Sequence, residues 1–431
     1  MKNLSRRMLG LISAVAIVAT ACGTSTTKLE VVSWWTTGDE ATGFNAVIAQ
    51  FNKDNPSIQV ANSAIAGDAG TVGQAALQNR VLNGVPPDTF QVVMGHQLLD
   101  TYVVPDYMDN LDDLFSANGW TTKFPQGVLD IVGAKDSSGT VHYYSVPVGI
   151  HRANLLWFNK NVFAANNLIP PATWSQFFTV ADALKAKGIT ALALGDKGIW
   201  ASGQLLETIL ISTLGANRYA GLWLGTTDWS GTDVKTALTT FQKVLTYVNA
   251  DHSSLNWDEA VDYLIPTADS TQPRGAMTIM SDTAVGEFDA KNFGDYGWAA
   301  APGTDRVYDA YGDSFGLPAK ASQKDAARKF LGFLGSATAQ DLFNPYDGSI
   351  PANTSAGNPP AGVKQYSAYQ KSAMSEWKAD AIVPSLEHGV AAAPSWQSAF
   401  ETAVAAFVAK PDLPVLQAAL VQACKDAAVC R

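Results

Sequence analysis

The segment KLEVVSWW, Lys28 to Trp35, is a nearly continuous apolar run, typical of a strand that a parallel sheet buries on both faces. A turn at Gly38 follows. Apolar residues then recur at helical spacing up to Phe51, and KDNPSIQV opens a second strand. The later segment AALQNRVLNGVPPDTFQVV repeats this order of helix, turn and strand. The pattern predicts an open α/β sheet in the first part of the chain.

Polar and aromatic residues gather where these strands end. In open α/β sheets, ligands bind at the carboxyl ends of the strands, beside helix N-termini. Trp34, Trp35 and Glu40 fall at that edge, and Gln91 lies near the end of the later strand. A tryptophan at a strand end also suits a hydrophobic core, so a core and a ligand interpretation of the two indoles compete.

The length of 431 residues is too great for one hydrophobic core, so we expect two lobes. Strand and helix patterns continue from YYSVPVGIHRANLLWFNK towards the C-terminus without a long linker. We therefore expect short, ordered hinge strands to cross between the lobes several times. The net charge of −10 argues against binding nucleic acid or anionic lipid through charge.

The N-terminus has the order of a secretory signal. Basic residues precede an uncharged apolar run from Met8 to Ala21, which is shorter than the roughly 20 residues of a membrane-spanning helix. The sequence ATAC ending at Cys22 resembles a bacterial lipobox, so we expect residues 1–22 to be a lipoprotein signal with Cys22 lipidated. Ordinary secretion is the alternative. Residues 23–28 then form a flexible tether.

Two cysteines, Cys424 and Cys430, remain after the signal. In an exported protein an even count favours a disulfide. A continuous helix would hold Cα atoms six residues apart at about 9 Å, beyond the limit of about 7 Å for a bridge. The last helix must therefore end near Ala423 to Asp426 if the bridge forms. Two cysteines are too few for a thiolate metal cluster, and the chain lacks the H-E-x-x-H pattern of zinc hydrolases. We therefore expect no metal site.

One catalytic pattern is present, since Gly312 to Gly316 reads G-x-S-x-G, the nucleophile elbow of serine hydrolases. Acidic residues and His388 follow Ser314 in the matching chain order. The elbow requires a helix directly after the serine, whereas Gly316-Leu317-Pro318 predicts extended chain. A serine hydrolase is therefore the weaker hypothesis.

Seven further motifs occur together in one order: LEVVSWWTTGDE, PPDTFQV, VPVGIHRANLLWFNK, MTIMSDTAVGEF, GDSFGLPAKA, FNPYDGSIPA and VPSLEHGVAA. In these the chain resembles the extracellular solute-binding proteins of bacterial ABC sugar importers, especially their glucose/mannose/galactose branch, from Lys28 to the last helix. The resemblance implies an α/β, two-lobe periplasmic-binding-protein-like fold without enzymatic activity or cofactor. We expect a first lobe of residues 29–145 plus 304–345 and a second lobe of residues 146–303 plus 346–431.

The resemblance also implies a sugar site. Its expected ligand contacts are Trp34, Trp35, Glu40, Gln91, Trp257, Ser281, Asp313, Asp347 and His388. An indole can cover the C–H face of a pyranose, while a carboxylate accepts hydrogen bonds from its hydroxyl groups. Asp313 matches the main carboxylate acceptor of the family, and Trp257 matches the aromatic residue that closes on the sugar from the second lobe.

Three positions depart from the family pattern. Val93 stands where the family has a histidine, Asp347 where it has a lysine, and Thr283 where it has a tryptophan. Exchanging a buried donor for an acceptor costs about 1–3 kcal/mol if the partner stays unmatched. We therefore expect a ligand other than plain glucose bound in the family's way: another hexose, an amino sugar that meets Asp347, or a larger glycoside.

The mechanism implied by the resemblance is capture by hinge closure, followed by docking of the closed protein on a membrane permease. The implied partners are a carbohydrate, the permease subunits and their ATPase, with a monomeric protein held by its lipid on the outer face of the cytoplasmic membrane or in the periplasm. A sensory lipoprotein that binds no sugar remains an alternative.

Overall fold

The computed structural model describes residues 26–66, 71–267 and 272–430. The expected signal segment and Cys22 lie outside these residues. Strand β1 (Thr27–Val32) starts within the expected tether, because Thr27 already pairs with Ile58 in the sheet. In the described part of the chain, no helix is both long enough and apolar enough to span a membrane.

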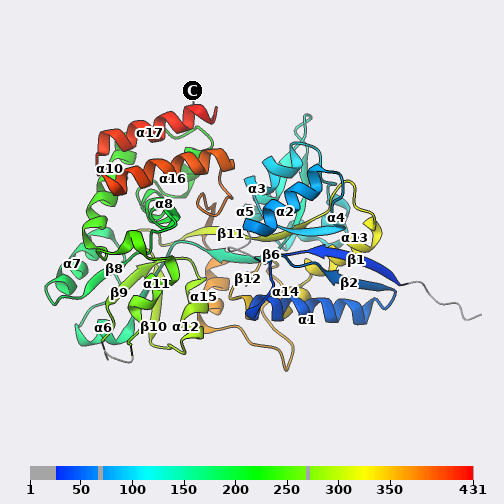
Figure 1. Cartoon of the computed structure of the whole chain (residues 1–431), viewed down its shortest axis with the longest axis horizontal. Coiled ribbons are helices and arrows are strands. Elements are labelled where there is room, and N and C mark those ends of the chain that lie inside the picture. Colours follow the sequence, from blue (N-terminus) through cyan, green and yellow to red (C-terminus); the bar gives the residue numbers. More distant parts are fainter. Residues whose placement is uncertain (1–25, 67–70, 268–271, 431) are drawn as a thin grey trace, which may run out of the picture.

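Two main sheets lie side by side, each flanked by helices, and form the two-lobe α/β fold expected from the sequence (Figure 1). The first sheet has the order β12-β6-β11-β3-β1-β2, with β13 paired to β11. Its further strands are β2 (Ile58–Asn62), β3 (Thr89–Val93), β6 (Ser145–Arg152), β11 (Val307–Gly316), β12 (Ile350–Pro351) and β13 (Ala381–Pro384). The second sheet has the order β10-β7-β9-β8, formed by β7 (Leu155–Asn159), β8 (Thr190–Ala193), β9 (Gly275–Ile279) and β10 (Tyr296–Ala300). A separate hairpin joins β4 (Gly133–Lys135) and β5 (Val141–Tyr143).

Most helices belong to only one lobe, whereas α15 also contacts the first lobe through Gln370, which donates to the carbonyls of Asn344 and Ser349. Those around the first sheet are α1 (Gly38–Asp54), α2 (Thr71–Leu82), α3 (His96–Leu98), α4 (Asp112–Asn118), α5 (Gln126–Val132), α13 (Lys324–Leu334) and α14 (Ala337–Asp347). The remaining helices are α6 (Lys160–Ala165), α7 (Trp174–Lys185), α8 (Trp200–Leu214), α9 (Ala216–Trp223), α10 (Thr232–Val244), α11 (Trp257–Val261), α12 (Ala284–Ala290), α15 (Ala368–Trp377), α16 (Pro394–Ala409) and α17 (Leu413–Asp426).

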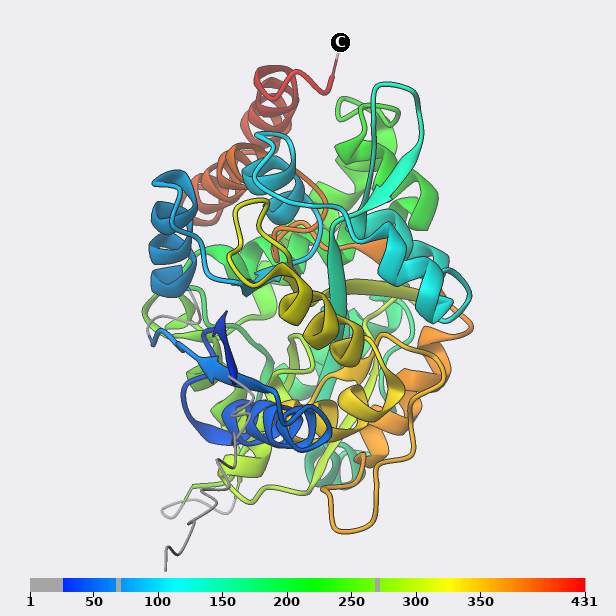
Figure 2. The ribbon, with the colours of Figure 1, turned by 90° about the vertical axis from the view of Figure 1, so that its right-hand side faces the viewer.

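The apolar run of β1 is buried on both faces of the first sheet. Leu29 and Val31 face a core that α1 and α14 complete, whereas Val32 faces a smaller core built with α2. Figure 2, which looks onto this lobe, shows α1 on one side of the blue strands and α2 on the other. β1 pairs in parallel with β2 and β3, so the predicted β-α-β order is confirmed.

The chain passes between the sheets through short connections. It leaves the first sheet after Arg152 and enters the second at Leu155; it returns between Ala300 and Val307. Strands β6, β12 and β13 all pair in the first sheet, whereas our expected boundaries assigned β12, β13 and β6 from Val146 onward to the second lobe. The reason is that β11 is long enough to pair with β6 along most of its length.

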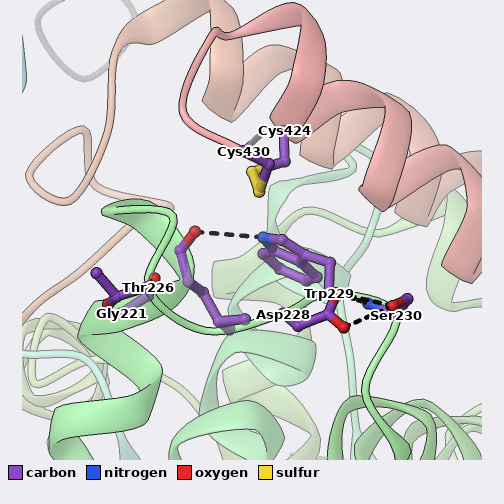
Figure 3. The surroundings of a disulfide bond; sticks show 8 residues. Gly221, Thr226, Asp228, Trp229, Ser230, Cys424 and Cys430 are labelled. Atoms are coloured by element: carbon purple, nitrogen blue, oxygen red, sulfur yellow. Dashed lines mark hydrogen bonds between the residues drawn. A yellow bond between two sulfur atoms is a disulfide. The ribbon is translucent and has the colours of Figure 1, made fainter.

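The second lobe ends in a disulfide between Cys424 and Cys430, whose Cα atoms are 5.3 Å apart. Helix α17 ends at Asp426, as the bridge requires. Figure 3 shows the bridge beside the indole of Trp229, whose Nε1 donates to the carbonyl of Leu222 at 3.3 Å. The bridge thus closes the C-terminal turn over an aromatic core.

Candidate functional site

Glu40 and Asp347 come close because α1 and α14 pack tightly at Gly43. A Cβ atom on Gly43 would lie 2.9 Å from the carbonyl oxygen of Phe343 and 3.1 Å from Cβ of Tyr346, so a larger residue would push the helices apart. Glu40 lies one turn before Gly43, and Asp347 is the last residue of α14. The contact therefore brings together two carboxylates that are about 300 residues apart in the sequence, close enough for Asp347 to raise the pKa of Glu40.

Asp313 adds a third carboxylate from β11. The pairing of β11 with β6 changes register directly after Asp313, an irregularity that redirects a strand's side chains. Oδ1 of Asp313 accepts a hydrogen bond from Nε2 of Gln91 at 2.7 Å. Oε1 of Gln91 accepts from the backbone N–H of Trp34 at 3.0 Å. Gln91 thus holds both the backbone at Trp34 and the carboxylate of Asp313.

Two of the three carboxyl groups, Glu40 and Asp313, have raised pKa values. Glu40 is exposed, yet desolvation by the protein around it, followed by repulsion from Asp347 and Asp313, raises its pKa to about 7, against the effect of His151. Burial also raises the pKa of Asp313 to about 6, although the hydrogen bond from Gln91 acts in the other direction. Glu40 is therefore partly protonated at neutral pH.

His151, on β6, balances part of this charge. Its Nδ1 lies 2.7 Å from Oδ1 of Asp282, and its Nε2 lies 3.4 Å from Oδ2 of Asp347. Asp282 follows β9 of the second sheet and also accepts from the hydroxyl of Tyr369 at 2.9 Å. Burial acts to lower the pKa of His151, but Tyr311, Asp282 and Asp347 together raise it well above its ordinary value. The imidazole is thus a cation that ties the two lobes to the carboxylates.

A stack of rings continues the cluster towards the second lobe. The ring of Tyr311 lies 4.9 Å from that of His151 and 3.8 Å from that of His388, both nearly parallel to it. Trp200 follows, with its ring 6.1 Å from His388. Burial, assisted by the charge of His151, lowers the pKa of His388 to about 3, so this imidazole is neutral. Its buried Nε2 has no hydrogen-bond partner within the described residues.

Two tryptophans of the second lobe lie on adjoining loops. Trp200 begins α8 and Trp257 begins α11, and both are half-buried. The loops are joined by a hydrogen bond from the N–H of Lys197 to the carbonyl of Leu255 at 2.9 Å. Ile199, directly before Trp200, has φ 59°, which a β-branched residue rarely adopts. Such held strain is common at ligand-binding sites.

Trp35 is the first correction to the expected contacts. It is 2% exposed, and its ring lies 4.3 Å from Phe343 and 5.1 Å from Phe44. A ring enclosed by other rings cannot cover a ligand. The core interpretation of Trp35 is correct, whereas Trp34 remains half-buried beside Gln91.

Gln91 and Ser281 also turn inward. Gln91 is fully buried and uses its amide on Asp313 and Trp34. Ser281 is 1% exposed, and its hydroxyl lies 2.6 Å from that of Thr283. We expected both residues to contact the ligand, but their polar atoms are occupied by the protein, so they position other groups.

The nucleophile hypothesis for Ser314 is wrong. Ser314 is fully buried within β11, and its hydroxyl donates to the carbonyl of Val92 at 3.0 Å. β11 continues to Gly316, so no helix begins after the serine. The motif is part of a central strand.

The contacts expected from the sequence did not include Tyr311, Trp200 or His151. Tyr311 is two residues before Asp313, so strand alternation places both side chains on one face and could have indicated it. Trp200 carries no such signal, because its place beside His388 depends on a contact between distant segments.

The arrangement suits a ligand rich in hydroxyl groups. It combines carboxylate acceptors, a neutral imidazole and half-buried indoles, the set that binds polar groups and C–H faces together. Within the described residues, no three His, Cys, Asp or Glu side chains are placed to share a metal ion. A hollow of about 560 Å³ lies elsewhere, on the second lobe, and its lining includes Lys243, His252 and Val408 but none of the expected ligand contacts.

Known proteins resemble this chain along most of its length. The model of the family "Bacterial extracellular solute-binding protein" matches residues 34–341. An ABC transporter extracellular-binding protein of Pyrococcus horikoshii is 35% identical over 84% of this chain and 80% of its own. A probable sugar-binding periplasmic protein of Mesorhizobium japonicum is 26% identical over 94% of both chains. The solved structure of the bacterial solute receptor AcbH has a TM-score of 0.79 at 20% identity, over 94% of this chain and 99% of that chain.

Proposed function

Because the chain belongs to the bacterial extracellular solute-binding protein family, we propose that it is the carbohydrate receptor of an ABC importer. Two linked sets of polar and aromatic groups, which draw on both lobes, carry this proposal. One set runs from Trp34 through Gln91 to Asp313. The other runs from Asp347 through His151, Tyr311 and His388 to Trp200. Its function is to bind a solute and not to transform it.

In the proposed complex the sugar lies between the lobes. Trp34 offers an indole from the first lobe, and Trp257 and Trp200 offer indoles from the second. Glu40, Asp313 and Asp347 accept hydrogen bonds from hydroxyl groups, and the free Nε2 of His388 accepts or donates one according to its tautomer. This set supports a carbohydrate without deciding between a hexose and an oligosaccharide.

The relatives support the same class of ligand. The Mesorhizobium relative is described as sugar-binding, and the AcbH receptor is reported to prefer β-D-galactopyranose. The lobe connections at Arg152 to Leu155 and at Ala300 to Val307 are short enough to act as hinges.

Closure follows from contacts that exist only when both lobes touch the ligand. A sugar held first by the carboxylates would draw Trp257 and Trp200 towards it. The closed form then docks on the permease subunits, whose ATPase drives import. We also propose that the protein is a monomer anchored through lipidated Cys22 outside the cytoplasmic membrane; Cys22→Ala should release it from the membrane fraction.

A binding screen tests the proposal. Isothermal titration calorimetry of the mature chain with neutral and amino monosaccharides and with disaccharides should find at least one ligand, and that ligand should raise the midpoint of thermal unfolding. The Asp313→Ala variant should lose both effects. If no carbohydrate binds, the protein is a receptor for another solute or a sensory lipoprotein, and the proposal fails.

A further inference from the structure

The first-lobe side of the proposed site has more negative than positive charge. The charged groups that act on Glu40 are Asp347 and Asp313, with His151 as the opposing cation. The charge of His151 is shared with Asp282, whose Oδ1 lies 2.7 Å from Nδ1 of the imidazole. Lys364 lies nearby, but its ammonium pairs with Asp39 at 2.7 Å. A neutral ligand would cover this excess of carboxylates without compensating it.

Asp347 lies where a negative charge is least favourable in a helix. It is the last residue of α14, and Gly348 ends the helix with φ 89°. The unpaired carbonyl groups of a helix C-terminus carry partial negative charge, which favours a cation there. A carboxylate at this end adds to the negative potential and makes the position attractive to a positively charged group.

One buried oxygen of Asp347 has a long ion pair but no hydrogen bond in the described part of the chain. The side chain is 3% exposed, and Oδ2 has no hydrogen-bond partner within the described residues, although it lies within ion-pair distance, 3.4 Å, of Nε2 of His151. A buried carboxylate oxygen without a hydrogen bond is costly unless a ligand supplies the donor. An ammonium group supplies three donors and a charge.

We propose that the ligand is a sugar with a free, protonated amine, and that Asp347, with Glu40 and Asp313, selects it over the corresponding hydroxyl and N-acetyl sugars. This inference rests on the proposed carbohydrate site. The same charges exclude sugars that carry a carboxylate or a phosphate, because such ligands would add a like charge to the carboxylate cluster.

The first test compares matched ligands on the unaltered protein. Calorimetry at about pH 6 with glucosamine, N-acetylglucosamine and glucose, and with the three galactose counterparts, varies a single substituent. One charge-assisted contact makes the amine of at least one series about tenfold or more tighter than both of its neutral analogues. If a neutral sugar binds as tightly as its amine, the inference is wrong while the proposed function stands. If none of the sugars binds, the inference fails too, and the wider carbohydrate screen then decides the proposed function.

The number of protons released or taken up when the ligand binds provides an independent test. An ammonium beside Glu40 favours its ionised form, so binding releases protons near neutral pH. A neutral sugar buries the same carboxyl and favours its protonated form, so binding takes protons up. Calorimetry at about pH 6 in buffers of different ionisation enthalpy measures this exchange. Net proton uptake with the tightest ligand would overturn the inference.

Asp347→Asn tests the residue itself. This change removes one charge and keeps the shape, so the amine loses about tenfold more affinity than the matched neutral sugars do, and the preference for the amine falls by that factor. Asp39→Asn is the matched control, since it removes a neighbouring but exposed carboxylate and should leave the preference unchanged. An unchanged preference in Asp347→Asn contradicts the inference. If that variant unfolds, Glu40→Gln on the exposed first turn of α1 gives the same comparison.

Discussion

The first lobe supplies carboxylates held by tightly packed secondary structure, whereas the second lobe supplies indoles at the starts of two helices. Glu40, Asp313 and Asp347 are fixed by the close contact at Gly43 and by the hydrogen bond from Gln91. Trp200 and Trp257 follow adjoining loops. The difference suggests a division of labour in which rigid carboxylates select the ligand and the aromatic residues respond by closing over it.

The largest expected effect separates the two adjacent tryptophans. Trp35→Ala should lower the free energy of unfolding by about 3–5 kcal/mol, as expected for an aromatic residue removed from a core, and Trp34→Ala should change it far less. Conversely, Trp34→Ala should weaken sugar binding about tenfold. Chemical denaturation and calorimetry on both variants measure the two effects. A greater loss of stability in Trp34→Ala would reverse the assignment.

Asp313→Ala should have the next largest effect. It removes hydrogen bonds to a charged acceptor, each worth about 1.5–3 kcal/mol, so Kd should rise about 100-fold. Asp109→Ala is the control, because it removes a carboxylate that pairs with Lys324 outside the site. Equal affinities of the two variants would show that the carboxylate cluster does not select the ligand.

Trp257→Ala should act on closure. We expect Kd to rise about tenfold, with the ligand-induced decrease in radius of gyration reduced or lost. Small-angle scattering with and without sugar measures this decrease. Leu224→Ala, an exposed position in the same lobe, is the control. Full compaction in Trp257→Ala would assign closure to other contacts.

Glu40→Gln should have the smallest effect, and it depends on pH. The pKa of Glu40 is raised from 4.5 to about 7 in the folded protein, so the folded state binds more protons than the unfolded state between these values. Glu40 therefore costs no stability below about pH 4, costs progressively more between about pH 4.5 and pH 7, and costs its full amount above about pH 7. The gain in unfolding temperature of the variant over the unaltered protein should appear as the pH rises above about 4.5 and level off above about pH 7. A gain that is equal at acidic pH would contradict the shift.

The sequence predicted the two-lobe fold and the β-α-β order because hydrophobic periodicity records which faces are buried. It could not place β6 in the first sheet, since that position depends on pairing with β11, more than 150 residues away. The motifs around Glu40, Asp313 and His388 were enough to propose these residues as ligand contacts. That Gln91 and Ser281 turn inward was not, because their hydrogen-bond partners come from distant parts of the fold or depend on local geometry.

Trp34 and Trp35 show what the alternation of side chains along a strand can and cannot predict. Trp35 shares a core with Leu29 and Val31, the residues of matching parity along the chain. Alternation of side chains could thus have indicated that only one of two adjacent indoles faces a ligand. Trp200 carried no comparable local signal.

The most direct test is the structure of the protein crystallised with the tightest ligand from the screen. The account predicts a sugar ring between Trp34 and the indoles of Trp200 and Trp257, with polar substituents on Asp313 and Asp347. A ligand bound elsewhere, or one that contacts a single lobe in the closed protein, would contradict it.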